Sequence, residues 1–189
     1  VFAALTDELM GDRAQGFQAQ LDSSELFDGE IKLGLGSSAA PLVAYVSALH
    51  AATGTGDRPD PASLWETLQG IHRAAQGGQG SGVDLAAARY GGAIGFSEVR
   101  PRSRLDLPTG LHWQAIWCGE PASTAAMLAQ LASWRRSHSS EYNREMTGLA
   151  ALSAQGLSAI GQDNASNFIE ICREYRDRLW ALGKQSGVG

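Results

Sequence analysis

Glycine is concentrated at a few places in this chain, and each cluster limits what the surrounding backbone can form. The 189 residues include 23 glycines, with clusters at 34–36, 77–82 and 91–95 and two more at the C-terminal end. Because glycine readily adopts left-handed backbone angles, such clusters predict tight turns and element ends. They divide the sequence into short segments whose apolar spacing can be interpreted one at a time.

The segments between the glycine clusters carry mostly helical patterns. Leu42, Tyr45, Val46 and Leu49 follow the i, i+3, i+4, i+7 spacing and, with Val43, predict a buried helix from about residue 38 to 53. Further helices are predicted over 61–76, 83–90 and 123–136, and two more within 140–182, separated near 161–164. Strands are predicted at 93–98 and 111–118. Because helices and strands mix without strict alternation, the sequence predicts an α+β fold.

The polar segment from Arg100 to Pro108, with prolines at 101 and 108, is the best candidate for a linker. We expect a domain boundary there, with residues 1–108 in one domain and 109–189 in the next.

The net charge of -5 gives no general attraction to nucleic acid or to an anionic membrane. The longest nearly uncharged run, 39–52, is shorter than the roughly 18 to 20 residues of a membrane helix. That short run leads us to expect a soluble protein. Two cysteines 54 residues apart indicate neither a disulfide framework nor a zinc site, so we expect a reducing, cytoplasmic location.

The segment Lys32-Leu-Gly-Leu-Gly-Ser-Ser-Ala-Ala40 leads directly into the first buried helix. Glycines let several N–H groups converge at a helix start, where the helix dipole attracts anions, so this turn suits a phosphate. It also fits the loose dinucleotide pattern G-x-G-x-x-[GA], with Asp57 downstream, but the preceding residues 25–32 are too polar for the buried strand that pattern needs. A nucleotide-dependent oxidoreductase is therefore a distant alternative. An ordinary glycine turn with a serine helix cap stays open as well.

The same segment resembles the central phosphate-binding motif of the GHMP small-molecule kinases. A second stretch, Gly78 to Gly92, contains Gly80-Ser81-Gly82-Val83-Asp84 and is similar to the family segment that carries the catalytic Asp. Residues 117–124 and 183–189 are similar to two further stretches of the family branch that phosphorylates phosphomevalonate. The resemblance implies a two-domain α+β fold, present here in part, with a ribosomal-protein-S5-domain-2-like N-terminal domain and a ferredoxin-like C-terminal domain. It also implies that both ends of the family chain lie outside this sequence.

The resemblance implies a role for each motif residue. ATP phosphates would be bound by the turn residues Gly34, Leu35, Gly36, Ser37, Ser38 and Ala39, with Ser38 also a ligand of Mg²⁺. Asp84 and Lys32 would be catalytic. The acceptor, phosphomevalonate, would be bound by Ser81, Gly82, Lys184 and Ser186. The alternatives are purely structural roles: Asp84 and each serine could cap a helix, and Lys32 could be a solvated surface residue.

Several family members place a magnesium-binding Glu about a dozen residues before the Asp, where this chain has His72 and Arg73, so the second metal ligand is open. The four histidines have no Ser, Asp or Cys partner at a recognisable spacing, and we expect core or surface roles for them. The function implied by the resemblance is transfer of the ATP γ-phosphoryl group to phosphomevalonate by a monomer or homodimer. The alternatives are a mevalonate kinase or another GHMP kinase, and a non-catalytic nucleotide-binding module.

Overall fold

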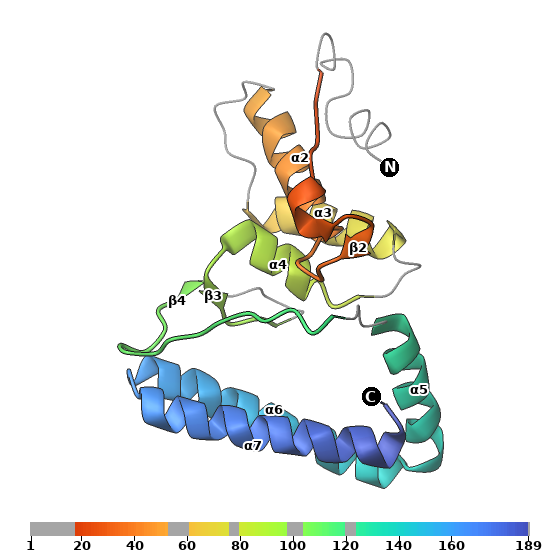
Figure 1. The fold of residues 1–189 in the computed structure, drawn as a ribbon, viewed down its shortest axis with the longest axis vertical. Helices are drawn as coiled ribbons and strands as arrows, with labels where there is room; N and C mark the ends of the chain where they lie inside the picture. The colour runs from red at the N-terminus through yellow and green to blue at the C-terminus, as the bar shows by residue number, and fades with distance from the viewer. Residues whose placement is uncertain (1–17, 53–60, 76–79, 98–103, 120–123, 189) are drawn as a thin grey trace. The chain divides into compact units, whose positions relative to one another are not determined.

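The computed structural model describes residues 18–52, 61–75, 80–97, 104–119 and 124–188 (Figure 1). The chain forms two compact units, residues 1–104 and 105–189. The boundary expected at residues 108 and 109 stays a prediction, and residues 100–103 of the expected linker lie outside the described part. Within the described ranges, no helix has both the length and the apolar character to cross a membrane.

The first unit contains a short polar hairpin just before the glycine turn. A 3-10 turn, η2 (Ser24–Leu26), leads into β1 (Phe27–Asp28), which pairs antiparallel with β2 (Ile31–Lys32). Phe27 is opposite Lys32 and Asp28 is opposite Ile31. None of these strand residues is buried, so the polar sequence correctly predicted that no buried strand precedes Gly34. This removes the structural basis for a dinucleotide fold at the turn.

Three helices form the core of the first unit. They are α2 (Ala39–Ala52), α3 (Pro61–Ala75) and α4 (Val83–Tyr90). Their inner faces share one buried cluster, made of Ala39, Leu42, Val43, Tyr45, Val46, Leu49, Leu64, Trp65, Leu68, Leu85 and Ala86. The three helices predicted here are confirmed, and in α2 and α3 residues that gave the apolar spacing are among those that pack together. Beyond α4, the strand predicted at 93–98 is reduced to β3 (Ala93–Ile94), which pairs with β4 (Arg104–Leu105).

The second unit is built from three helices, α5 (Thr124–Ser137), α6 (Ser139–Gly161) and α7 (Ala165–Ser186). The α6 and α7 helices run antiparallel beside each other, drawn in blue in Figure 1. Leu152, Ala159 and Ile171 form their buried contact, with Phe168 and Tyr175 packed against it. The predicted helices of this part of the chain are confirmed, including the break near 161–164.

An ion pair joins α6 to α7 further along the hairpin. Arg178 Nε lies 3.0 Å from Glu145 Oε2, and Arg144 Nε lies 3.1 Å from Oε1 of the same carboxylate. The hydrogen bond from Arg144 lowers the pKa of Glu145 below its ordinary value, burial opposes this effect, and Arg178 adds to it. The carboxylate therefore stays ionised although the residue is buried.

The strand predicted at 111–118 is wrong. These residues adopt no regular structure, and Trp113 and Ile116 are 73% and 79% exposed. A strand needs a partner to accept and donate its backbone hydrogen bonds, and none of the described residues pairs with this segment. The mixture of helices and short strands agrees with an α+β fold, whereas the ferredoxin-like architecture expected for the second domain stays a prediction.

Candidate active site

The glycine turn begins α2 through the carbonyl of Gly36. That oxygen accepts hydrogen bonds from the N–H groups of Ala39 at 3.0 Å and Ala40 at 2.9 Å. Gly34 and Gly36 have φ angles of +73° and +76°, in the left-handed region where other residues are strained. Glycine fits both positions because the backbone between the exposed strand β2 and the buried start of α2 takes these left-handed angles.

The turn leaves backbone donors at the helix start. Among the described residues, no protein group accepts a hydrogen bond from the N–H of Ser37 or Ser38, and neither hydroxyl caps the helix. Ser37 is half-buried, and Leu35 and Ser38 are exposed, so the donors are accessible. Free N–H groups combined with the positive end of the helix dipole form a site that suits a phosphate.

The second motif forms the start of α4. Gly82 caps this helix in a left-handed conformation, with φ +80°, and its carbonyl accepts from Ala86 N–H at 3.0 Å. A side chain at residue 82 would lie against Trp65 and Gln69 of α3, so the turn packs closely on that helix. Ser81 Oγ accepts a hydrogen bond from Val83 N–H at 3.3 Å.

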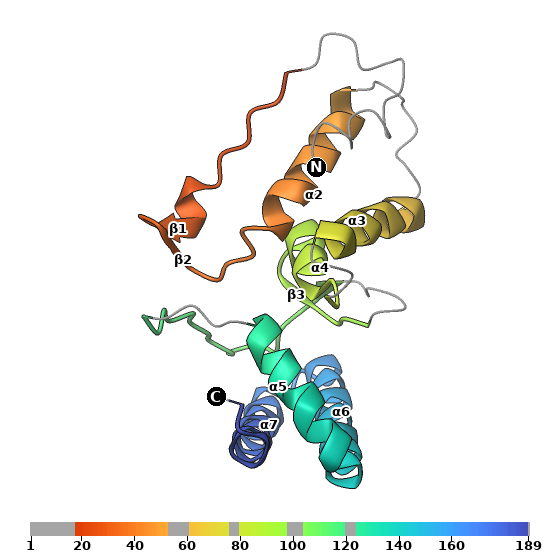
Figure 2. The same cartoon turned by 90° about the vertical axis from the view of Figure 1, so that its right-hand side faces the viewer.

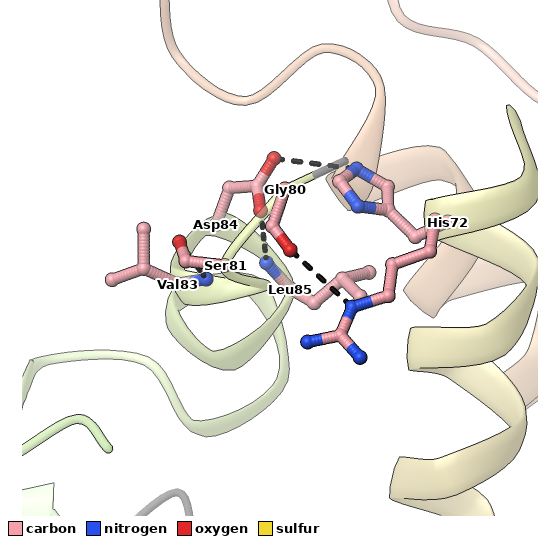
Figure 3. A network of polar contacts seen from close by, with 7 residues as sticks. His72, Gly80, Ser81, Val83, Asp84 and Leu85 are labelled. Carbon is pink, nitrogen blue, oxygen red and sulfur yellow. Dashed lines mark hydrogen bonds and ion pairs between the residues drawn. The ribbon is translucent and has the colours of Figure 1, made fainter. Parts of the chain in front are cut away.

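Asp84 lies in the first turn of α4 and is not its cap, because Gly82 holds that position. One carboxylate oxygen, Oδ1, accepts from Leu85 N–H at 3.0 Å, and the other, Oδ2, lies 3.3 Å from His72 Nε2 (Figure 3). The Asp84 side chain is 35% exposed, whereas that of His72 is 4% exposed. The carboxylate is thus fixed from the protein side and open to a ligand on the other.

The core role expected for a histidine is confirmed for His72, which also meets an acidic partner, Asp84, that sequence spacing did not reveal. This residue is on α3, four positions after Leu68, on the face that packs into the core. The signal available in the sequence was a histidine at a core-facing position of a helix, 12 residues before the motif Asp. Its neighbour Arg73 also approaches the motif, because its Nε donates to the carbonyl of Gly80 at 3.4 Å.

The two motifs lie together in the first unit. Ala39, at the start of α2, and Leu85 and Ala86, at the start of α4, are fully buried in the same cluster. Figure 2 shows the first turn of α2 against α4. Lys32 is exposed at the end of β2, two residues before Gly34. The phosphate-suited turn and the Asp84 segment are therefore brought to one region by the packing of α2 on α4.

Lys184 and Ser186 belong to the second unit, and their contribution to an acceptor site stays a prediction. Both are on the last turn of α7, where Ser186 Oγ donates to the carbonyl of Leu182 at 2.7 Å. Lys184 Nζ lies 5.3 Å from the centre of the Trp180 ring. The Ser186 hydroxyl is buried within its own helix, and the Lys184 ammonium is exposed over an aromatic face.

The oxygen donors near the turn fit a magnesium ion that is bound mainly by a nucleotide. Mg²⁺ prefers oxygen ligands and is commonly held by one or two protein groups together with substrate phosphates. Ser38 Oγ and the Asp84 carboxylate are ligands of this kind. No group of three or more His, Cys, Asp or Glu side chains suited to a metal occurs in the described ranges. His72, with a ring nitrogen, is not the kind of ligand that Mg²⁺ prefers.

Comparisons with known proteins agree with this arrangement. The family model described as "GHMP kinases N terminal domain" matches residues 2–92. The chain is also similar to the phosphomevalonate kinase of Streptomyces sp. (strain CL190), with 31% identity over 209 residues, covering 96% of this chain and 54% of that protein. It thus spans about half the length of this relative, and no solved structure matches it. With the motif turn, the Asp84 segment and these two matches, the chain belongs to the GHMP kinase superfamily.

Proposed function

We propose that the protein transfers the γ-phosphoryl group of MgATP to phosphomevalonate, giving diphosphomevalonate and ADP. The observation that carries the proposal is the pairing of two motifs in one unit. Within the part of the chain that the structure describes, the N–H groups of Ser37 and Ser38 have no protein acceptor, and the helix that they precede packs on α4, which carries Asp84. The acceptor is inferred from the similarity to a phosphomevalonate kinase.

Phosphoryl transfer requires a protein mainly to position the reactants and to stabilise negative charge. In this proposal the backbone from Gly34 to Ala39 binds the ATP phosphates, and Ser38 Oγ binds the magnesium ion that the nucleotide brings. The ion neutralises phosphate charge when bound. Lys32, exposed at the end of the hairpin, stabilises charge on the group in transfer. Ser81 and Gly82, at the start of α4, bind the acceptor in this proposal, and the part of Lys184 and Ser186 in acceptor binding stays a prediction.

The proposed reaction does not require a general base to remove a proton from the acceptor. An oxygen of the acceptor phosphate forms the new bond to the γ-phosphorus, and the bond from that phosphorus to the bridging oxygen of ADP breaks. Because a phosphate monoester has a second pKa near 6, the attacking oxygen is already mostly deprotonated at neutral pH. We infer that Asp84 orients Lys32 and the acceptor and does not remove a proton. This predicts a shallower pH dependence of turnover than in a kinase whose acceptor is a hydroxyl group.

The test is an ADP-release assay on the full-length protein with MgATP and phosphomevalonate, mevalonate or no acceptor. Turnover with phosphomevalonate alone is the expected result. Turnover with mevalonate alone would keep the superfamily and the residue roles but transfer the proposal to a mevalonate kinase. Nucleotide binding without turnover on either acceptor, or on other small alcohols and phosphates, would favour a non-catalytic binding module.

A matched pair of variants tests the role of Asp84. Asp84→Asn removes the negative charge but keeps the size of the side chain, and we expect it to abolish turnover. If wild-type turnover with phosphomevalonate varies little around neutral pH, loss in Asp84→Asn cannot be attributed to proton abstraction. A wild-type profile that falls steeply on the acid side, as for a hydroxyl kinase, would contradict the orienting role.

A further inference from the structure

The carboxylate of Asp84 is held at two points, and the two differ in kind. Its contact with Leu85 N–H is local, because any residue in the first turn of a helix is near the next backbone N–H. Its contact with His72 Nε2 joins α4 to α3 across 12 residues of sequence (Figure 3). None of the four stretches that carry the resemblance includes this histidine, which stands near the place where several family members have a magnesium-binding Glu, and the proposed function assigns it no role.

The surroundings of His72 make an apolar side chain the ordinary choice. The residue is 3% exposed, and it follows Leu68 by four positions and Trp65 by seven on the core face of α3. Placing a polar ring in a buried position destabilises the fold unless the ring finds a polar partner. Asp84 Oδ2, at 3.3 Å, is such a partner. The contact therefore gives a reason for an imidazole at a position where packing alone favours a leucine.

The consequence for Asp84 is a fixed side-chain orientation. An Asp side chain has three staggered χ1 positions, and a single local contact on Oδ1 still leaves the plane of the carboxylate free to turn. A donor on Oδ2 from another helix removes that freedom. The side chain keeps 35% of its surface exposed, so ligands meet a carboxylate whose direction is set from behind.

We propose that His72 is a positioning residue: its Nε2–H holds Asp84 in the orientation that phosphoryl transfer needs. This inference rests on the proposed kinase function. His72 touches neither reactant and acts only through Asp84. The requirement is a donor at the place of Nε2, which distinguishes it from a requirement for ring volume or for positive charge.

Two conservative variants separate these requirements. The side-chain amide nitrogen of His72→Gln reaches the place of Nε2, whereas that of His72→Asn reaches only the place of Nδ1. We expect His72→Asn and His72→Leu to lower kcat on the order of 10- to 100-fold, since small misplacements of a catalytic group have effects of this size. We expect His72→Gln to recover most of that loss. The KM for ATP should stay within about twofold in all three, because the turn before α2 binds the phosphates.

A spectroscopic measurement tests the contact without using activity. In protein carrying ¹⁵N-labelled histidine, NMR resolves the ring nitrogens of each imidazole. We expect Asp84→Asn to shift the Nε2 and attached-proton signals of His72 and to leave those of His112, which is exposed in the second unit, unchanged. His112→Gln is the matched control: it removes one imidazole, identifies its signals and keeps wild-type kcat.

The outcomes distinguish the inference from the proposed function. A shifted His72 signal together with rescue by Gln and not by Asn supports the positioning role. Full activity in folded His72→Leu, or equal loss in the Gln and Asn variants, would overturn it, as would a His72 signal that Asp84→Asn leaves unchanged. If the wild type transfers phosphate to no acceptor, the proposed function fails and the catalytic role of the contact fails with it, while the NMR shift separately reports whether the contact exists.

Discussion

Gly36→Ala tests whether the left-handed backbone of the phosphate-suited turn is a real constraint. A Cβ at residue 36 would meet no atom within 4 Å, so the substitution adds no collision. Its effect comes from the φ of +76°, which strains a residue with a side chain by about 1–2 kcal/mol. Alanine also restricts the unfolded chain, which offsets roughly 0.4–1 kcal/mol of that strain. We expect a net loss of about 1 kcal/mol in the free energy of unfolding.

Gly70→Ala is the matched control for this measurement. Gly70 is exposed within α3, a Cβ there also meets nothing within 4 Å, and its φ lies outside the left-handed region. Alanine should therefore stabilise this helix by about 0.5–1 kcal/mol. The two variants share the same chemical change and the same effect on the unfolded chain. The difference between them isolates the strain, about 1–2 kcal/mol.

Urea unfolding of both variants beside the wild type measures the two free energies, and titration with MgATP measures nucleotide affinity. We expect Gly36→Ala to weaken MgATP binding, because the turn can relieve its strain only by moving the N–H groups of Ser37 and Ser38. Gly70→Ala should bind as the wild type does. Changes of equal sign and size in the free energy of unfolding of the two variants would refute the argument from backbone strain. An unchanged MgATP affinity in Gly36→Ala would refute the link between this turn and phosphate binding.

Three further substitutions probe other parts of the chain. Gly82→Ala has room for a Cβ beside Trp65, but its φ of +80° strains a residue with a side chain. We expect it to lower the free energy of unfolding by about 1 kcal/mol, measured by urea unfolding, and to reduce kcat in the ADP-release assay. No change in either quantity would contradict the left-handed cap. Asn164→Ala removes the oxygen that caps α7 and should lower that free energy by about 1 kcal/mol in thermal or urea unfolding, whereas Asn164→Asp keeps an acceptor and should be nearly neutral. Glu145 has a folded pKa below its ordinary value, chiefly through Arg144, so its stabilising effect is present above the ordinary pKa and is lost as pH falls through the folded pKa. As the pH falls from about 7 to 3, the free energy of unfolding of Glu145→Gln should therefore decrease less than that of the wild type. Urea unfolding at several pH values measures this, and an equal decrease in both proteins would contradict it.

Helices were predictable from this sequence because their periodicity is local. Leu42, Val46 and Leu49 repeat on one face of α2, and the glycines at 34–36 fix where that helix begins. The strand predicted at 111–118 failed for the opposite reason, since alternation in a segment does not supply the partner strand. The two-residue strands β1 and β2 are too short to leave a pattern at all.

The candidate site was predictable where it consists of consecutive residues. The sequence predicted the backbone turns at 34–38 and before Asp84, because glycine there allows left-handed angles, whereas the functional roles of these residues stay predictions. The contact of His72 with Asp84 was missed because it depends on how α3 packs against α4. A buried face of a helix can be predicted from spacing, but the partner that a polar residue on that face meets cannot.

The turn that joins α6 to α7 has a consequence for the order in which the second unit folds. Only residues 162–164 separate the two helices, and the paired side chains Leu152 and Ile171 are close in sequence. Contacts of this kind require little loop closure, so we expect the hairpin to form early, on the fast timescale of local helical structure. Asp163 then accepts a hydrogen bond from the N–H of Thr109 at 2.6 Å, over 54 residues of sequence. Because that acceptor is presented by the finished turn, the segment around Thr109 acquires its place only after the hairpin exists.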